Sequence, residues 1–471
     1  MSNRASTKVF TNSRAVLLVA CAIACGAVAS CSAQDAAPTP VAPLTHDEML
    51  DPQSCSGCHA EHYQQWSGSM HAYAAEDPLF IAMNARGQRE TKGALGTFCV
   101  QCHAPMAVKL GLTKDGLNLA SLPQPVRGVT CYYCHSVESV DGAHNAPQKL
   151  ANDDVMRASI SDPIGNHAHA SSYSKLHDGE RVDSAPLCGA CHDLQNGNGV
   201  DLQRTFAEWK GSLFSHDVPG VRLSCASCHM PGKDGLAAKV KGAPRRRVHD
   251  HMMPGVDVAI SPFAEADAQR AAVQANLDPS LVPKLCVTPK PGGWQIEYWL
   301  DDAFAGHDWP SGASYHRRAW VEITASSKGA VVWHTGAVPA DKAASTLTAA
   351  DDPSFWHLGD QLLDAAGKPV EMLWPATSVA ALQLPPAVTS DRTDPKFYHA
   401  VIKDFDVPPA DLDDVKAQVH IRPVDYDFVD DLIASGDLDP SYRAKVTTFT
   451  LSGTVLEWTK DLGPTCIPSP K

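Results

Sequence analysis

The pattern Cys-x-x-Cys-His occurs five times between residues 55 and 229 and constrains this chain more than any other feature. Two thiols at this spacing can add to the two vinyl groups of one porphyrin, and the histidine that follows can bind its iron. We therefore predict five covalently attached c-type haems, each held by one copy of the motif. The copies are Cys55, Cys58 and His59; Cys99, Cys102 and His103; Cys131, Cys134 and His135; Cys188, Cys191 and His192; and Cys225, Cys228 and His229.

Other uses of cysteine fit this pattern poorly. A structural zinc site needs pairs of Cys-x-x-Cys, or cysteines with a distant histidine, and has no need of a histidine directly behind each pair. A thioredoxin-like redox site needs one motif in a βαβ unit rather than five. The repeated histidine therefore favours haem over both alternatives.

The first residues of the chain are typical of a bacterial export signal. The basic stretch MSNRASTKVFTNSR precedes the apolar stretch AVLLVACAIACGAVAS, which is short for a transmembrane helix. Because the residues before Cys31 resemble a lipobox, we predict a signal peptide over 1–30, a lipid anchor at Cys31 and a tether over 31–48. A cleaved secretory signal without lipid is the alternative. In both cases we expect export to the periplasm or the cell surface, and Ser32 favours the outer membrane of a Gram-negative bacterium.

The charge of the chain limits its partners. The 39 basic and 53 acidic residues give a net charge of −14, which becomes −17 in a mature chain without Arg4, Lys8 and Arg14. This charge argues against nucleic acid and against an anionic membrane surface. It favours basic redox partner proteins, although a solvated acidic surface without a partner gives the same composition.

Two cysteines lie outside the motifs and the export signal. These are Cys286 and Cys466. In an oxidising compartment an isolated pair is most simply a disulfide, with two free buried thiols as the alternative.

The pattern of the sequence changes near residue 260, from haem motifs with few apolar runs to alternating β-branched segments. We therefore predict an α+β protein with two domains. The haem motifs lie in 49–260, which has few long apolar runs and should consist of short helices and loops wrapped on haem. The second domain, 261–471, should open with a helix over 261–277. Alternating β-branched segments then predict a β-sandwich-like fold, with strands over 294–300, 318–325, 329–336, 416–423 and 444–458.

The haem segment resembles the multihaem cytochrome c-554 family, whose relatives include hydroxylamine oxidoreductase and the octahaem tetrathionate reductases. The segments that carry the resemblance extend beyond the motifs themselves. CSGCHAEHYQQWSGSMHA is similar to the first-haem segment of the family, and TFAEWKGSLF, CASCHMP and HDHMMPG are similar to a fifth-haem extension in larger relatives. CVQCHAPM, RGVTCYYCHS and LCGACHD fit the second, third and fourth haems, and GHDWPSGASYHRRAWVEITA is similar to an attached β-domain.

The resemblance also implies the second axial ligands. It places His71 on the fourth iron and His144 on the first, and it favours His251 near the fifth motif. Of the histidines just before the fourth motif, we expect His167 or His169 to be a ligand. No second ligand is assigned to the iron of His103, which makes it the candidate open site. His307 and His316 lie in the β region, where we expect structural roles.

The preferred interpretation is an exported pentahaem cytochrome that carries electrons along its haems. A reductase or oxidase of a small nitrogen or sulfur compound, acting at one open haem, is the second hypothesis. A docking protein that binds a redox partner through its β-domain is the third. The sequence assigns no catalytic residue, so whether the protein is an enzyme stays open.

Overall fold

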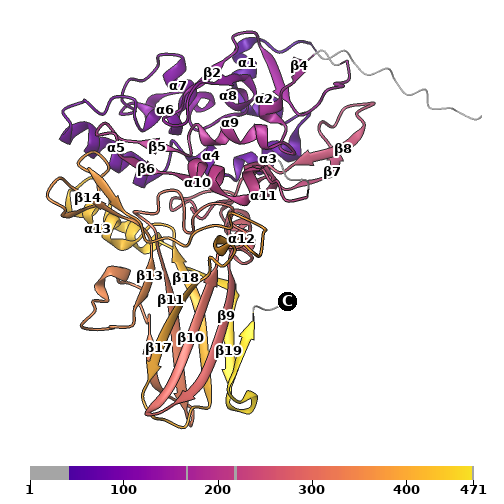
Figure 1. Ribbon diagram of the computed structural model, residues 1–471. Coiled ribbons are helices and arrows are strands. Elements are labelled where there is room, and N and C mark those ends of the chain that lie inside the picture. Colours follow the sequence, from indigo (N-terminus) through magenta and orange to yellow (C-terminus); the bar gives the residue numbers. More distant parts are fainter. Residues whose placement is uncertain (1–41, 166–167, 217–219, 469–471) are drawn as a thin grey trace, which may run out of the picture. The chain divides into compact units, whose positions relative to one another are not determined.

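The computed structural model describes residues 42–165, 168–216 and 220–468. They belong to one compact unit that spans Val41–Lys471. The unit mixes helices with several sheets, which confirms the predicted α+β class (Figure 1). Cys31 lies outside the described residues, and a domain boundary near residue 260 stays a prediction. Among the described residues, none of the helices combines the length and apolar character needed to cross a bilayer.

The haem segment is built from short helices that begin at local caps. Thr45 caps the first in a capping box with Glu48. The stretch after His59 forms two helices, because Ser69 caps a new helix after Gly68. Asp77 caps the next helix, and Pro78 is its first residue. The helices are α1 His46–Leu50, α2 Pro52–Cys55, α3 Ala60–Ser67, α4 Met70–Tyr73, α5 Pro78–Glu90, α6 Val100–His103, α7 Pro105–Lys109, α8 Cys131–Ser136, α9 Ala185–Gly189, α10 Thr205–Gly211 and α11 Cys225–His229.

Four two-stranded sheets connect these helices. Three of them are antiparallel and the pair β3–β4 is parallel. Short 3-10 helices lie in the described loops at Leu119–Ser121, Gln124–Val126, Lys175–His177, Val182–Ser184 and Leu213–Ser215. The strands are β1 Val137–Val140, β2 Gln148–Leu150, β3 Val155–Ala158, β4 Ala170–Tyr173, β5 Leu194–Gln195, β6 Asp201–Gln203, β7 Gly232–Leu236 and β8 Arg245–His249.

The rest of the chain forms two larger antiparallel sheets, after the helix α12 (Ala266–Leu277). One has the order β17-β10-β9-β20 and the other β12-β11-β18-β19, with β13 paired to β11. All the predicted strands are present, but β9, β13, β17 and β20 were not predicted. The strands are β9 Val282–Lys290, β10 Gly293–Asp301, β11 Arg318–Ser327, β12 Ala330–Thr335, β13 Trp356–Leu358, β17 Val401–Val407, β18 Asp414–Arg422, β19 Phe449–Thr459 and β20 Thr465–Pro468.

Smaller elements lie in the loops between these strands. A three-stranded sheet has the order β15-β14-β16, and a helix that the sequence did not predict follows β18. The elements are β14 Gln361–Leu363, β15 Pro369–Val370, β16 Ser378–Ala380 and α13 Tyr426–Ala434.

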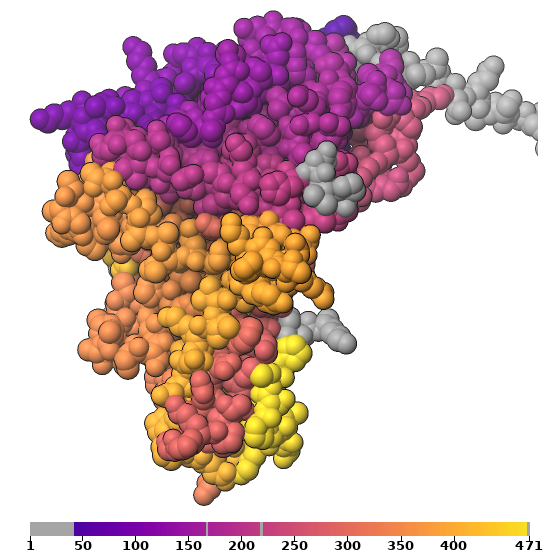
Figure 2. Space-filling model, viewed as in Figure 1, coloured from indigo at the N-terminus to yellow at the C-terminus, as the bar shows by residue number. Residues whose placement is uncertain are grey.

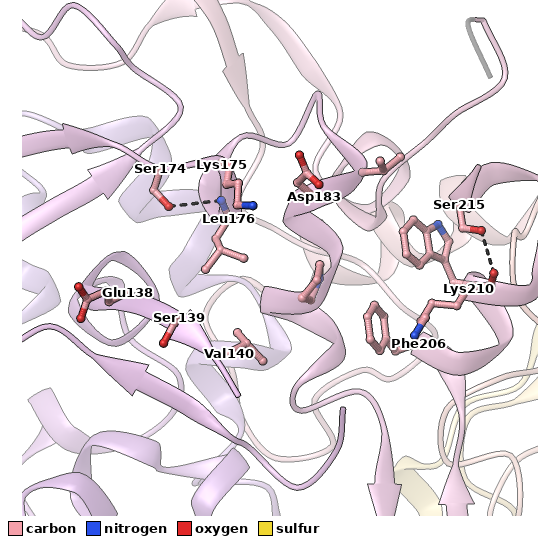
Figure 3. A pocket seen from close by; sticks show the side chains of 13 residues that line it. Glu138, Ser139, Val140, Ser174, Lys175, Leu176, Asp183, Phe206, Lys210 and Ser215 are labelled. Atoms are coloured by element: carbon pink, nitrogen blue, oxygen red, sulfur yellow. Dashed lines mark hydrogen bonds between the residues drawn. The ribbon is translucent and has the colours of Figure 1, made fainter. Parts of the chain in front are cut away.

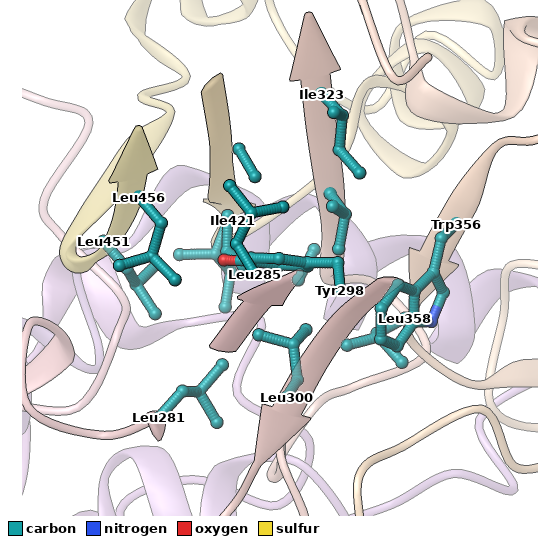
Figure 4. Packing of buried hydrophobic residues seen from close by; sticks show 14 of the residues in the cluster. Leu281, Leu285, Tyr298, Leu300, Ile323, Trp356, Leu358, Ile421, Leu451 and Leu456 are labelled. Atoms are coloured by element: carbon teal, nitrogen blue, oxygen red, sulfur yellow. The ribbon is translucent and has the colours of Figure 1, made fainter. Parts of the chain in front are cut away.

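The two larger sheets share one hydrophobic core. Leu285 of β9, Tyr298 of β10 and Ile323 of β11 are completely buried in it (Figure 4). Val273 and Leu277 of α12 pack into the same cluster. Alternate residues of β10 point inward, which explains the alternation of its sequence. This core fixes the ends of β10 and β11, and therefore the loop 302–317 between them.

Hydrogen bonds and ion pairs join the haem segment to this second part of the chain. Asn196 donates through Nδ2 to the carbonyl oxygens of Leu373 and Ala376, at 3.0 and 2.8 Å. Arg86 of α5 pairs with Asp431 of α13 at 2.8 Å. Asn196 is buried with its amide satisfied, and both contacts join the two segments.

Cys286 and Cys466 form a disulfide, which confirms the predicted pairing. The two cysteines lie within β9 and β20, opposite each other in the ladder, rather than outside the strands. The bond therefore attaches the last strand to the edge of its sheet.

We expect the Cys286→Ser/Cys466→Ser double variant to lose about 5 kcal/mol of unfolding free energy, because the closed loop spans a sequence separation of 180 residues. Urea unfolding of the variant and the parent measures this difference. The disulfide-intact parent treated with a reductant is the control, since it should approach the stability of the variant. An unchanged midpoint in both would contradict the expected stabilisation.

Candidate haem site

Each motif forms one helical turn, which brings its three functional side chains to one face. The histidine N–H donates to the carbonyl oxygen of the first cysteine in the first, second and fourth motifs, at 2.8, 3.3 and 3.1 Å. The third and fifth motifs lie within α8 and α11. Residues three and four apart are neighbours on a helical turn. Both thiols and the imidazole of every motif can therefore contact the same porphyrin.

Backbone carbonyls fix the orientation of four motif histidines. Nδ1 of His59 donates to the carbonyl oxygen of Ala237 at 2.7 Å. Nδ1 of His103 donates to the carbonyl oxygen of Ala74 at 3.0 Å. His135 donates to Arg157 at 2.6 Å and His229 to Pro254 at 2.7 Å in the same way. A carbonyl oxygen can only accept, so Nδ1 carries the proton and Nε2 keeps a free lone pair. Metal-binding histidines commonly have this arrangement.

Burial keeps these imidazoles neutral. It lowers the pKa of His59, His103, His135 and His229, although the bonds to backbone carbonyls oppose the shift. Burial, followed by neighbouring histidines, lowers the pKa of His192 to about 3. A neutral imidazole is the form that binds a metal ion.

A second imidazole faces four of the five motif histidines. Imidazole nitrogens bind metal ions at about 2 Å and lie roughly 1.1 Å from the centre of their ring, so two imidazoles on opposite sides of one iron have centres about 6.3 Å apart. The observed separations agree with this value. They are 6.2 Å for His59 and His169, 6.1 Å for His192 and His71, 6.3 Å for His135 and His251, and 6.4 Å for His229 and His307.

The facing histidines repeat the pattern of the motif histidines. His169, His251 and His307 each place Nδ1 within 3.0 Å of a backbone carbonyl oxygen, so Nε2 remains free. Nδ1 of His71 is buried and has no partner in the described structure. Burial lowers the pKa of His251 to about 3 and those of His71 and His307 to about 4. Each of the four pairs can therefore hold one iron.

The structure distributes the expected ligands differently from the sequence argument in two cases. His71 faces the fourth motif, where the resemblance places it, and His251 faces the third motif rather than the fifth. His169 faces His59, the position expected for His144. That iron binds these atoms stays a prediction.

His144 itself is exposed on the loop between β1 and β2. The next residues of this loop bind the chain after the fourth motif, because the amides of Asn145 and Ala146 donate to Asp193 and Ala190. The structure therefore does not bring His144 to the first motif. His167 lies outside the described residues.

His307 is the site residue that the sequence argument missed. It lies in the loop between β10 and β11, 78 positions after the motif histidine that it faces, and was expected to have a structural role. No local signal identifies it, because nine other histidines outside the motifs lie between the first motif and residue 260. The β-rich part of the chain thus contributes directly to the haem site.

Other buried histidines have their Nε2 engaged elsewhere. Nε2 of His177 bonds to the carbonyl oxygen of Cys134 at 2.7 Å, and Nε2 of His316 bonds to that of Glu371 at 2.7 Å. His249 lies 3.2 Å from Glu180. His62 lies only three residues after His59, with ring centres 6.2 Å apart and planes at 49°, and it contacts the ring of His251 edge-on at 4.7 Å.

His103 is the exception among the motif histidines. Phe80 stacks on its ring, with centres 4.0 Å apart and an interplanar angle of 3°. Parallel stacking places Phe80 beside the imidazole, not opposite its Nε2. Within 42–165, 168–216 and 220–468, no histidine ring pairs with His103, so the second iron is the candidate for an open position.

Contacts between thiols show which motifs are neighbours. The thiols of Cys55 and Cys131 lie close enough to act on each other, so that the pKa of Cys55 is lowered and that of Cys131 is raised. The same contact joins Cys102 to Cys191 and Cys188 to Cys225. The first motif therefore adjoins the third, and the fourth adjoins both the second and the fifth.

Orphaned polar atoms indicate that the site fits haem. Nδ1 of His71, Nε of Arg127, Oη of Tyr133 and Nε of Arg317 are buried without a partner in the described structure. A buried donor without an acceptor is costly. Each c-type haem carries two propionate carboxylates, which are acceptors for such donors. The donor set therefore suits the group that the motifs require.

A groove of about 590 Å³ opens near the fourth and fifth motifs (Figure 3). Its apolar wall includes Val140, Leu176 and the stacked rings of Phe206 and Trp209. None of the ten motif cysteines is among its described lining residues. Phe206 and Trp209 also pack with Cys225 of the fifth motif, so the groove adjoins that haem site. Figure 2 shows the side chains of the haem segment, coloured indigo to magenta, as a nearly continuous surface on the face in view.

The repeated Cys-x-x-Cys-His turns and the paired imidazoles define a multihaem c-type cytochrome. Residues 54–136 match the family model of cytochrome c554 and c-prime. The crystal structure of a penta-heme cytochrome c552 from Thermochromatium tepidum has a similar fold, with a TM-score of 0.59 and 21% sequence identity over 88% of this chain and 99% of that chain. The search of curated proteins found no match.

Proposed function

We propose that this cytochrome holds five c-type haems and carries electrons between redox partner proteins. The observation that carries the proposal is the set of four imidazole pairs at the separation expected for one iron. Iron with two axial histidines has no free position for a substrate, so it transfers electrons. The family and the penta-heme neighbour support the same function.

The thiol contacts support a branched order of the haems. Cys134 also lies close enough to Cys188 and Cys191 for their charges to raise its pKa, after the larger effect of burial. The third motif therefore adjoins the fourth as well as the first. In this order the fourth haem has three neighbours, namely the second, third and fifth, and the first, second and fifth haems are ends.

Export is part of the proposal. Covalent haem attachment to this motif takes place outside the bacterial cytoplasm, and the N-terminal residues are typical of an export signal. We propose a periplasmic or cell-surface location with a lipid at Cys31 on the outer membrane.

A second candidate function rests on His103. An iron with a free axial position can bind a small nitrogen or sulfur compound and reduce or oxidise it. The ring contacts of the described residues favour this possibility for the second haem and not for the others.

Electron paramagnetic resonance (EPR) of the oxidised protein tests both functions. We expect low-spin signals from four irons per chain and a high-spin signal from the second. The low-spin signal of the fourth iron should be distinct, because its imidazole planes meet at 84° while those of the first, third and fifth meet at 31° or less. Two or more high-spin irons would contradict the electron carrier.

Added cyanide or nitrite separates the carrier from the enzyme. If the second iron is open, its high-spin signal should convert on addition of either ligand, and turnover of nitrite or hydroxylamine would establish the enzyme. A protein with five low-spin irons and no turnover would leave electron transfer as its function. A pyridine haemochrome assay should give five haems per chain, and fewer would contradict the motif interpretation.

A further inference from the structure

Arg317 is a buried cation with an unused donor. It lies at the end of the loop that carries His307, and only 7% of its surface is exposed. Nη2 pairs with Oδ2 of Asp257 at 2.5 Å, and Nη1 donates to the carbonyl oxygen of Ser311. Nε is buried and has no acceptor in the described structure. Nη1 and Nη2 thus each have a partner, and Nε is the guanidinium nitrogen that is left without one.

The loop is shaped around this guanidinium. Gly312 has a φ of +79°, a conformation that other residues rarely adopt. A Cβ at this position would overlap Nη1 of Arg317. The guanidinium therefore fits only because residue 312 has no side chain, which indicates that the placement of Arg317 is specific.

The ion pair lies among the ligands of three irons. Burial lowers the pKa values of His192 and His307 most, and neighbouring histidines lower them further. The positive charge of Arg317 makes a smaller contribution in the same direction. These residues face the fourth and fifth irons. Asp257 has the opposite effect on His103, whose pKa it raises against the larger effect of burial. The two charges are therefore close enough to act on the haem ligands.

We propose that Nε of Arg317 donates to a propionate carboxylate of the fourth or fifth haem, and that its charge raises the reduction potential of that haem. The proposal rests on the proposed electron-transfer function. A guanidinium suits the role because it stays protonated and binds carboxylates with charge-assisted hydrogen bonds. A fixed positive charge near an iron favours the reduced form, which carries one negative charge more. Arg317 then makes that haem a more favourable place for an electron.

Redox titration followed by EPR tests the proposal on the full-length holoprotein. Arg317→Gln should lower the potential of the fourth haem, of the fifth, or of both, while the first and third haems stay unchanged. Asp257→Asn should shift the same haem in the opposite direction, because it removes the compensating negative charge. The distinct signal of the fourth iron shows which haem holds the contact. Arg317→Lys keeps the charge but loses the Nε donor, so its shift should be smaller than that of Arg317→Gln.

Arg86→Gln is the matched control, because Arg86, like Arg317, is a largely buried arginine that pairs with a partly exposed carboxylate, here Asp431 of α13. It should leave all potentials unchanged. Shifts of the same sign in Arg317→Gln and Asp257→Asn, or equal shifts in the control, would overturn the proposal. If Arg317→Gln does not mature, the sign of the Asp257→Asn shift decides, and an unchanged or lowered potential overturns it. A parent protein with fewer than five haems would instead contradict the proposed function.

Discussion

His307→Gly should open the fifth iron and convert it from low spin to high spin. The ring of His307 lies 6.4 Å from that of His229, and both rings have their Nδ1 bonded to backbone carbonyls, so only Nε2 can reach the iron. Glycine removes the ligand without introducing a new side chain. EPR of the oxidised protein should therefore show one additional high-spin iron per chain.

Free imidazole provides the sharpest control for this variant. It should occupy the space of the missing side chain and restore the low-spin signal. His399→Gly removes a different histidine, which pairs with Asp301 at the end of β10. This variant should leave the spectrum unchanged. An unchanged spectrum in His307→Gly would show that another group, or none, binds the fifth iron.

The contrast between His229 and His307 shows what could be predicted from the sequence. The first ligand of each haem is fixed by covalent spacing within five residues, so a local pattern identifies it. The second ligand depends on packing between distant segments. His169 faces a motif histidine 110 positions earlier, and His307 reaches its partner only because the core beneath β10 and β11 places their connecting loop.

The same reasoning explains which elements were predicted. The strand β10 alternates buried and exposed residues, and its period is visible in the sequence. In β9, Pro283 and Pro289 interrupt the pattern, and the strand is identified only by its pairing with β10 and β20. The helix α13 is short, and its buried face packs on α5 of the haem segment, which no local pattern shows. Tertiary contacts therefore determine the elements that the sequence pattern did not predict.

The Cys188→Ala/Cys191→Ala variant should divide the haem chain. The fourth motif has thiol contacts with the second and fifth motifs, and the third motif lies beside it. Without the fourth haem, the first and third haems still adjoin each other but no longer connect to the second or the fifth. Electrons that enter at the first haem should then reduce two irons per chain instead of five.

A photoreductant attached at Lys239→Cys can deliver these electrons, because Lys239 is exposed and its amide donates to the carbonyl oxygen of Cys58 in the first motif. EPR of samples frozen after illumination then shows which irons are reduced. Cys225→Ala/Cys228→Ala is the matched control, since it also removes one haem but from an end of the chain. In this control all four remaining irons should be reduced. If the second and fifth irons are still reduced at the parent rate without the fourth haem, the branched order is wrong and electrons take another route.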